Sequence, residues 1–258
     1  MSTVTAERPS VSRDPRLRER RVAVARAAGR RRLRIVLAAA GLAAVIGGGL
    51  ALLHSPLLAA RVVRISGASH TPRPAVLAAS GLSGRPPLID VGPAAVAARL
   101  EALPWVATAS VRRQWPDGVR VALTERTPVA VVVAGGETAL VDASGRVLAR
   151  SVQQPSGTFR ILAPAPLPAP GADLPPSDRP LLAVANGFPA SLAPAVRAIE
   201  ERAGGVDLVL AAGPLVELGP QPRPGAQAVA LATLLARVGL AGVVAIDLRV
   251  PTAPVLTR

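Results

Sequence analysis

The sequence holds few side chains that could carry out chemistry. Cysteine is absent from its 258 residues, which excludes disulfides, thiolate nucleophiles and thiolate metal ligands. His54 and His70 are the only two histidines, and neither has a second histidine or a carboxylate at the spacing of a metal site. We therefore predict that the protein has no metal site, no cofactor and no catalytic histidine.

Hydroxyl and carboxylate side chains form no recognisable catalytic set either. The stretch SGLSGR fails the nucleophile-elbow pattern G-x-S-x-G, because Arg85 stands where the second glycine is needed. Asp142 lies in a turn-like stretch, DASG, which favours a turn-forming aspartate over a catalytic one. A glycine-rich phosphate loop and an HExxH motif are also missing from the sequence. The pattern favours a binding protein over an enzyme.

The N-terminal part of the chain has the pattern of a membrane anchor behind a basic arm. Residues 1–34 hold eleven arginines against three acidic residues, a net charge of +8 out of +14 for the whole chain. Residues 35–53 form a charge-free run of 19 residues, which spans about 28 Å as a helix, close to the ~30 Å hydrocarbon core of a bilayer. We predict an uncleaved transmembrane helix over 35–55. The alternative is a signal peptide, whose apolar and basic regions are usually shorter.

The distribution of arginine also predicts the orientation of the chain. The basic arm at 1–34 is expected to stay in the cytoplasm, which places the residues after the helix outside it, in a single-pass type II topology. Arginines next to the helix favour contact with anionic lipid headgroups over nucleic acid. Inside the helix, Ala39, Ala43, Gly47 and Ala51 lie four apart and form a stripe that could pack on another helix, although the alanine-rich composition also explains them.

The chain after the anchor begins with a small unit of strands and helices. We expect, in order, a strand at 62–65, a helix from the N-cap Thr71 to Gly81, a helix at 92–103, and strands at 106–114 and 119–126 around the turn WPDG. This order, β-α-α-β-β, places a single hairpin after two helices.

Both tryptophans of the chain flank the first strand of this hairpin, although only 2% of the residues are aromatic. We predict a small core that contains Trp105, Val111, Trp115 and Leu123, because the odd-numbered positions of both strands are apolar and the even-numbered ones mostly polar. Centring the hairpin on Asp117 places Val111 opposite Leu123. The alternative is that Trp115 is exposed at a partner site.

The rest of the chain is predicted to form a mostly antiparallel β domain with flanking helices. We expect, in order, strands at 129–134, 140–141 and 147–148, a proline-rich loop at 162–180, a helix at 191–205, a hairpin at 206–220, a helix at 225–239 and a final strand at 242–250. The predicted fold class is therefore α+β, with a single-pass anchor before two globular units.

Several of these stretches together resemble a known family. The run LPWVATASVRRQWPDGVRVALTERTPVA (103–130), with VVRISG before it and LVDASGRVL and AIDLRVP after it, is similar to the bacterial cell division proteins of the FtsQ/DivIB family. The resemblance covers about residues 35–251 and implies a POTRA domain at 62–130, a β domain at 131–250 and a tail at 251–258. One position departs from the family: Gln227 stands where a lysine often enters the last helix.

The resemblance implies a non-enzymatic scaffold of the divisome, in the cytoplasmic membrane at the division septum. The implied partners are small coiled-coil membrane proteins of the FtsB/DivIC and FtsL types, other divisome components and membrane lipid, without nucleic acid or a small-molecule substrate. The implied role is to help control septal peptidoglycan synthesis. The alternative is a membrane-tethered envelope enzyme such as a cell-wall hydrolase, which would need a pocket with two convergent carboxylates.

The partner site is predicted at the C-terminal end of the chain. The strand Val243–Val250 is expected to be the uncovered edge of an antiparallel sheet, and such an edge accepts a strand from another protein through its free backbone groups. The resemblance points to the same strand and to the segment after it. The residues predicted to bind the partner are Val243, Ala245, Asp247, Arg249, Val250, Thr252, Val255 and Leu256. The alternative is a bare edge that Asp247 and Arg249 solvate and that Pro251 and Pro254 close to further pairing.

Overall fold

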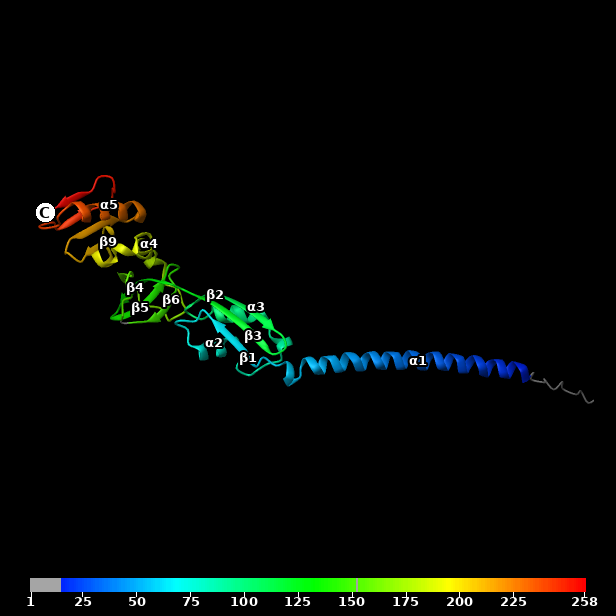
Figure 1. The fold of residues 1–258 in the computed structure, drawn as a ribbon. Coiled ribbons are helices and arrows are strands. Elements are labelled where there is room, and N and C mark those ends of the chain that lie inside the picture. The colour runs from blue at the N-terminus through cyan, green and yellow to red at the C-terminus, as the bar shows by residue number, and fades with distance from the viewer. Residues whose placement is uncertain (1–14, 152) are drawn as a thin grey trace, which may run out of the picture.

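The computed structural model describes residues 15–151 and 153–258, with side chains from Arg32 onward. Most of the basic arm predicted at 1–34 therefore lies outside the part of the chain whose side chains are described. Along the described chain, a long helix is followed by a small three-stranded domain and then by a domain built on a nine-stranded sheet (Figure 1). The fold class is α+β, as predicted.

Helix α1 (Pro15–Leu53) stands apart from the two domains (Figure 1). Its segment Arg32–Leu53 has 22 residues, is strongly apolar and has no buried residue. At about 1.5 Å per residue this segment is about 33 Å long, which is enough to cross a bilayer. Its exposed leucine, isoleucine and valine side chains therefore match a lipid environment, in agreement with the anchor predicted at 35–55.

The first domain has the predicted order of elements. They are β1 (Val62–Ser66), α2 (Arg73–Ser80), α3 (Pro93–Glu101), β2 (Val106–Gln114) and β3 (Gly118–Glu125), with the 3-10 turns η1 (Pro56–Leu58) and η2 (Leu88–Asp90). The strands lie in the order β1-β3-β2, with β1 parallel and β2 antiparallel to β3.

The core of the first domain lies between its two helices and one face of its sheet. Val76, Val96 and Leu100 from the helices share this core with Val111 and Leu123 from the hairpin. Strand alternation explains the arrangement from Thr108 onward, because the odd-numbered side chains of both strands point to the helix side and the even-numbered ones point to the opposite face of the sheet, which the helices leave open. A bulge between Val106 and Thr108 shifts the pairing at the start of β2, and Val106 is buried in the same core.

The hairpin turn lies one residue earlier than predicted. Val111 pairs with Val121 and not with Leu123, and the last pair before the turn is Gln114 with Gly118. Gly118 belongs to the strand because it faces Gln114 closely: a Cβ at Gly118 would lie 3.0 Å from the Gln114 carbonyl oxygen. Since the pairing shifts by two residues, each side chain keeps its predicted face.

The second domain combines nine strands with two helices. Its strands are β4 (Pro128–Ala134), β5 (Glu137–Asp142), β6 (Val147–Arg150), β7 (Phe159–Leu162), β8 (Val196–Arg202), β9 (Gly205–Leu210), β10 (Leu215–Gly219), β11 (Ala245–Asp247) and β12 (Val255–Thr257). Its helices are α4 (Arg179–Gly187) and α5 (Pro224–Arg237), and its 3-10 turns are η3 (Pro176–Asp178) and η4 (Ala190–Ala195). The strands lie in the order β12-β11-β10-β9-β8-β7-β4-β5-β6, with parallel pairing at β4–β7, β7–β8 and β10–β11.

The helix predicted at 191–205 is wrong. This stretch forms the 3-10 turn η4 followed by strand β8. Pro194 explains the difference, because it removes a backbone donor from the middle of the expected helix. Leu192 and Val196, which lie at helical spacing in the sequence, are both buried but belong to two different elements.

The loop predicted at 162–180 runs into a helix that the sequence analysis missed. Helix α4 begins at Arg179, directly after the proline-rich stretch, and buries Leu181 and Val184 in the core of the second domain. Pro180 at its first turn fits this start, because a proline there sacrifices no helical hydrogen bond.

The C-terminal strand also differs from the prediction. The strand expected at 242–250 is reduced to the three residues of β11, which runs parallel to β10 and is covered on its other side by β12. Pro251 and Pro254 lie in the loop that connects β11 to β12. The uncovered edge predicted at Val243–Val250 is therefore wrong, because the chain returns and pairs with this strand itself.

Candidate functional site

The last strand, β12, forms one edge of the large sheet. Among the described residues, no strand pairs with its outer side. Val255 on this strand is 59% exposed, whereas Leu256 packs against the core of the domain. The outer side of β12 therefore offers backbone N–H and C=O groups that another strand can bind.

The structure separates the eight predicted partner residues into two groups. The inner group lies in β11 or next to it in the sequence: Val243, Ala245, Asp247 and Arg249. The outer group lies on the segment that returns to the edge: Val250, Thr252, Val255 and Leu256. Because β10 and β12 flank β11, the inner group has no free backbone edge to offer.

An apolar groove of about 530 Å³ lies between α5 and the loop that leads into β12. Its lining residues are Ala226, Val229, Ala230, Thr233, Leu234, Pro251, Thr252 and Pro254. Val229 is 67% exposed there. Exposed apolar side chains next to an unpaired strand are typical of a surface that binds another protein.

Asp247 and Arg249 bind each other at the end of β11. The guanidinium Nε of Arg249 lies 2.9 Å from Oδ2 of Asp247, and its backbone N–H donates to Oδ1 at 2.9 Å. The side-chain hydrogen bond, followed by the backbone one, lowers the pKa of Asp247. Glu217 of β10 lies 3.8 Å from the same guanidinium. This cluster fixes the direction in which the chain leaves β11.

Gln227 of α5 is buried and closes the same end of the sheet. Its amide donates to the carbonyl oxygens of Leu218 at 2.9 Å and Leu248 at 3.1 Å, and its oxygen accepts the N–H of Arg223 at 2.8 Å. Buried carbonyls need such partners, because leaving them unpaired is unfavourable. From the sequence, Gln227 was notable only because many members of the family have a lysine at this position. Its hydrogen bonds show that its side chain holds α5 against the ends of β10 and β11.

A second cluster of polar side chains joins the two domains. Arg126, directly after β3, donates to Asp142 Oδ2 at 2.7 Å and to the carbonyl oxygen of Val106 at 3.1 Å. Asp142 also accepts the backbone N–H groups of Ser144 and Arg146, at 2.9 Å and 3.0 Å. Asp142 therefore forms a turn, as predicted, and in addition binds the first domain. The sequence carried no signal for this pairing.

The two tryptophans do not lie in the core of the first domain, so their predicted role there is wrong. Trp105 packs against apolar side chains of β4, β5 and β6, and its ring stacks on His70 with the centroids 4.3 Å apart. Trp115 is 51% exposed at the tip of the hairpin. The prediction failed because Trp105 precedes β2 and Trp115 follows it, so strand alternation applies to neither.

Glu125 ends β3 and holds the chain just before α2. Its carboxylate accepts the backbone N–H groups of His70 at 2.9 Å and Thr71 at 2.8 Å, and it lies 2.9 Å from Nδ1 of His70. Thr71 is therefore not the predicted N-cap, because α2 begins at Arg73 with Pro72 before it. Burial alone would raise the pKa of Glu125, but these hydrogen bonds lower it from 4.5 to about 2.

We predict that Glu125 stabilises the folded protein at neutral pH and less in acid. Its pKa is 4.5 in the unfolded chain and about 2 in the folded one, so its contribution is complete above 4.5 and is lost as the pH falls toward 2. The melting temperatures of wild type and Glu125→Gln should therefore differ at neutral pH and converge in acid. A difference that stays constant down to about pH 3 would contradict this role.

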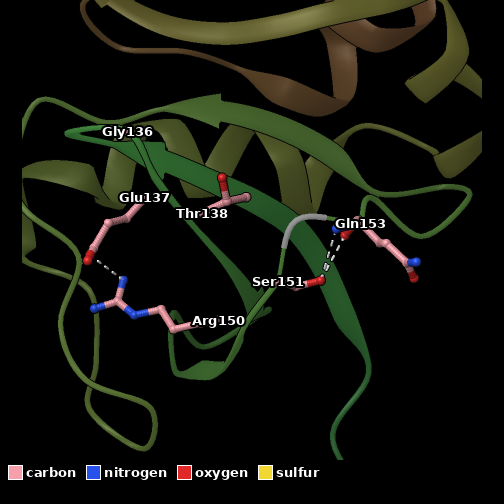
Figure 2. Close-up of a pocket in the computed structure, with 6 residues that line it drawn as sticks. All are labelled: Gly136, Glu137, Thr138, Arg150, Ser151 and Gln153. Atoms are coloured by element: carbon pink, nitrogen blue, oxygen red, sulfur yellow. Dashed lines mark hydrogen bonds and ion pairs between the residues drawn. The ribbon is translucent and has the colours of Figure 1, made fainter.

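A separate pocket lies where the turn between β4 and β5 meets the end of β6 (Figure 2). It has a volume of about 550 Å³, and its lining residues are Gly136, Glu137, Thr138, Arg150, Ser151 and Gln153. Glu137 is the one carboxylate among these residues, and it lies 3.1 Å from the guanidinium of Arg150 (Figure 2). The lining lacks the two convergent carboxylates that a wall hydrolase would need.

The described part of the chain brings no three histidine, aspartate or glutamate side chains together as a metal site. Each histidine instead meets a single carboxylate. His70 lies 2.9 Å from Glu125, and His54 lies 3.5 Å from Asp90. These are isolated contacts between one histidine and one carboxylate, and they tether loops to neighbouring elements.

The sequence matches two family descriptions in succession. Residues 58–126 match "POTRA domain, FtsQ-type", and residues 130–249 match "Cell division protein FtsQ/DivIB, C-terminal". The first range contains β1 to β3, and the second begins within β4 and extends past β11.

Curated relatives carry the name cell division protein FtsQ. The one from Mycolicibacterium smegmatis is 32% identical over 198 residues, which cover 74% of this chain and 56% of the relative. The one from Streptomyces collinus is 38% identical over 136 residues, 52% of each chain. The one from Anaeromyxobacter sp. (strain K) is 38% identical over 145 residues, 56% of this chain and 48% of the relative. The chain thus spans about half the length of these relatives.

Among solved structures, the chain matches one domain of the cell division protein DivIB from Geobacillus stearothermophilus, the major extracytoplasmic domain of its trans isomer. The TM-score of this match is 0.33, and the sequences are 16% identical. The match covers 45% of this chain and 98% of that domain.

The two family matches follow one another along the chain, in the order of the two domains. A helix long and apolar enough to cross a membrane precedes them. The relatives at 32% and 38% identity carry the same family name. The chain therefore belongs to the FtsQ/DivIB family and is a membrane-anchored cell division protein.

Proposed function

We propose that this protein is a non-enzymatic scaffold of the division machinery at the septum. It binds small single-pass coiled-coil division proteins of the FtsB/DivIC and FtsL types and helps to control septal peptidoglycan synthesis. Membership in the FtsQ/DivIB family supports a role in division. The observation that carries the binding role is the free outer edge of β12 beside an apolar groove.

The partner binds by adding a strand to the outer side of β12. Backbone hydrogen bonds supply affinity in this mode, and alternate side chains supply selectivity. Because β12 has only three residues, its backbone pairing is short. The groove between α5 and the returning loop therefore receives an apolar side chain of the partner, which acts as an anchor.

The predicted partner residues have two different roles in this proposal. The outer group makes the contact: Val250, Thr252, Val255 and Leu256. The inner group holds β11 and the turn after it in position: Val243, Ala245, Asp247 and Arg249.

A proline in β12 tests the proposal. Successive backbone N–H groups of a strand point to opposite sides, so one of Val255 and Leu256 donates outward and the other faces β11. The outward position tolerates proline, and its variant is identified by unchanged thermal unfolding. We expect this variant, as full-length protein in detergent, to bind the FtsB/DivIC-type partner at least about tenfold more weakly, equivalent to ~1.4 kcal/mol, by biolayer interferometry.

A second variant tests the groove independently. Val229→Asp places a charge among apolar side chains at an exposed position, so it should weaken partner binding without unfolding the domain. The matched control is Ala172→Asp, at an exposed loop position away from the edge. If the folded proline variant and Val229→Asp both bind with wild-type affinity, the C-terminal edge is not the partner site.

The arrangement across the membrane is also part of the proposal. The basic arm at 1–34 is cytoplasmic, the helix at 35–55 spans the membrane, and the POTRA domain at 62–130, the β domain at 131–250 and the tail at 251–258 lie outside. The sequence has no cysteine, so a single introduced one reports its own location. We expect Ala212→Cys, at the exposed β9–β10 turn, to react with a membrane-impermeant maleimide in intact cells. Labelling only after lysis would reverse the topology.

A further inference from the structure

The open face of the POTRA sheet carries a row of three arginines. Arg64 of β1 pairs with Arg120 of β3, and Arg120 pairs with Arg112 of β2, so the row crosses the whole three-stranded sheet in register. All three side chains are exposed. Neighbouring strands lie about 4.8 Å apart, so the row is about 10 Å wide.

This row opposes folding. Like charges directly opposite one another on neighbouring strands repel and destabilise a sheet. Within the described chain, none of the three arginines forms an ion pair with a carboxylate, and Arg64 donates a hydrogen bond to the neutral side chain of Gln114 at 3.1 Å. Stability of the domain therefore does not account for the row, whereas an anionic surface opposite it would.

The row lies close to the membrane anchor. Arg61 and Val62 donate their backbone N–H groups to the carbonyl oxygen of Asp117, at 2.9 Å and 3.1 Å, so the tip of the β2–β3 hairpin lies beside the start of β1. Residues 54–61 connect this point to the end of the apolar helix at Leu53. The hairpin accordingly directs its turn toward the end of α1 (Figure 1). Membrane insertion of α1 thus holds the hairpin tip near the bilayer surface.

The tip also has the composition of a membrane-interface segment. Trp115 is exposed there, and Leu57 in the connection from the anchor is 66% exposed. Tryptophan concentrates at the headgroup level of membranes, where its ring meets both apolar and polar surroundings. Two acidic side chains lie at this end of the domain, Asp117 in the turn and Asp90, which pairs with His54. The three positive charges of the arginine row outnumber the two negative charges of these aspartates.

We propose that the POTRA domain docks on the surface of the bilayer that holds α1, with Trp115 at the headgroup level and the arginine row Arg64–Arg120–Arg112 bound to the phosphate groups of anionic phospholipids. The pair Arg112–Arg120 lies two residues, or about 7 Å, from the last pair before the turn. The headgroup layer is about 5–8 Å deep on each side of a membrane, so the arginine side chains reach it. Docking of this kind fixes how far the second domain and its β12 edge stand from the membrane.

Full-length protein in lipid nanodiscs tests the docking. Brominated acyl chains quench tryptophans at the bilayer, and Trp105 serves as an internal reference because it lies about 30 Å from Trp115 along β2. We expect the emission of Trp115 to be quenched at least about twofold more strongly in brominated phosphatidylglycerol than in brominated phosphatidylcholine. The Trp115→Phe variant should show only the unquenched emission of Trp105.

The role of the charges is tested with the triple variant R64Q/R112Q/R120Q. Its melting temperature should equal or exceed that of wild type, because the repulsion along the row is relieved. Its quenching in phosphatidylglycerol should fall to the phosphatidylcholine level. The matched control R160Q/R179Q/R197Q removes three exposed arginines of the second domain and should leave the quenching of Trp115 unchanged.

Three results would overturn the proposal. Absence of Trp115 quenching in both lipids means that the domain stands clear of the bilayer. Equal quenching in both lipids, or unchanged quenching in the triple variant, means that the arginines do not recognise anionic lipid.

Discussion

An Asp142→Ala variant is expected to lose about 3 kcal/mol of unfolding free energy, because removing one partner of a largely buried ion pair leaves the other charge uncompensated. Asp142 is 6% exposed, and its carboxylate lies 2.7 Å from the guanidinium of Arg126. Its second oxygen accepts the N–H groups of Ser144 and Arg146, which close the turn between β5 and β6. Alanine removes the interdomain contact and the turn contacts together.

Thermal unfolding of the full-length protein in detergent, followed by circular dichroism, measures this loss. For a protein of this size, each kcal/mol lowers the melting temperature by about 2–4 °C, so a decrease of roughly 10 °C is expected. Asp142→Asn is the matched control, since it keeps an acceptor for the turn and loses only the charge, and its decrease should be smaller. A melting temperature of Asp142→Ala within about 1 °C of wild type would show that the contact between Arg126 and Asp142 contributes little to stability.

The same variant has an expected pH dependence. Burial alone would raise the pKa of Asp142, but hydrogen bonds from Ser144, Arg126 and Arg146 outweigh it and lower the pKa below the ordinary 3.8. A lowered pKa means that the contribution of Asp142 is present above pH 3.8 and is lost below it. The difference between wild type and Asp142→Ala should therefore shrink as the pH falls below this value.

A Trp105→Ala variant is expected to lose about 3 kcal/mol, because truncating a large aromatic ring leaves a cavity that the surrounding strands fill only in part. The ring packs on side chains of β4, β5 and β6 and stacks on His70. Its loss therefore weakens the contact between the two domains and leaves the core of the POTRA domain intact.

The comparison with Trp115→Ala makes this prediction specific. Trp115 is exposed, so its truncation should change the free energy of unfolding by no more than about 0.5 kcal/mol. Limited proteolysis at the junction around Thr127 should accelerate for Trp105→Ala and not for Trp115→Ala. Equal stability losses in the two variants, or unchanged cleavage at the junction, would refute the placement of Trp105 between the two domains.

Features that depend on neighbouring residues were predictable from the sequence. The apolar run before Leu53 has the length and hydropathy of a membrane span. The alternation in β2 and β3 placed Val111 and Leu123 on the core face, and the DASG stretch indicated that Asp142 forms a turn. In each case the physical cause acts over a few positions along the chain, through helix length, strand pleat or local hydrogen bonds.

Two predictions failed where local signals were ambiguous or cut short. Leu192 and Val196 have helical spacing, but Pro194 breaks the helix and β8 pairs with β7 and β9 in the sheet. Trp105 and Trp115 continue the odd-numbered pattern of β2, but they lie beyond its ends, where the strand no longer orients side chains. Periodicity predicts the face of a residue only within an element that forms.

The sequence by itself determined the anchor, the order of elements in the first domain and the motifs that mark the family. Only the tertiary structure decided which residues meet across long stretches of chain. It paired Arg126 with Asp142, carried Trp105 onto the second domain, and returned Val255–Thr257 to cover β11 and become the sheet edge. Such contacts depend on how whole helices and strands pack and pair. Their residues lie at no fixed spacing in the sequence, so no local pattern predicts them.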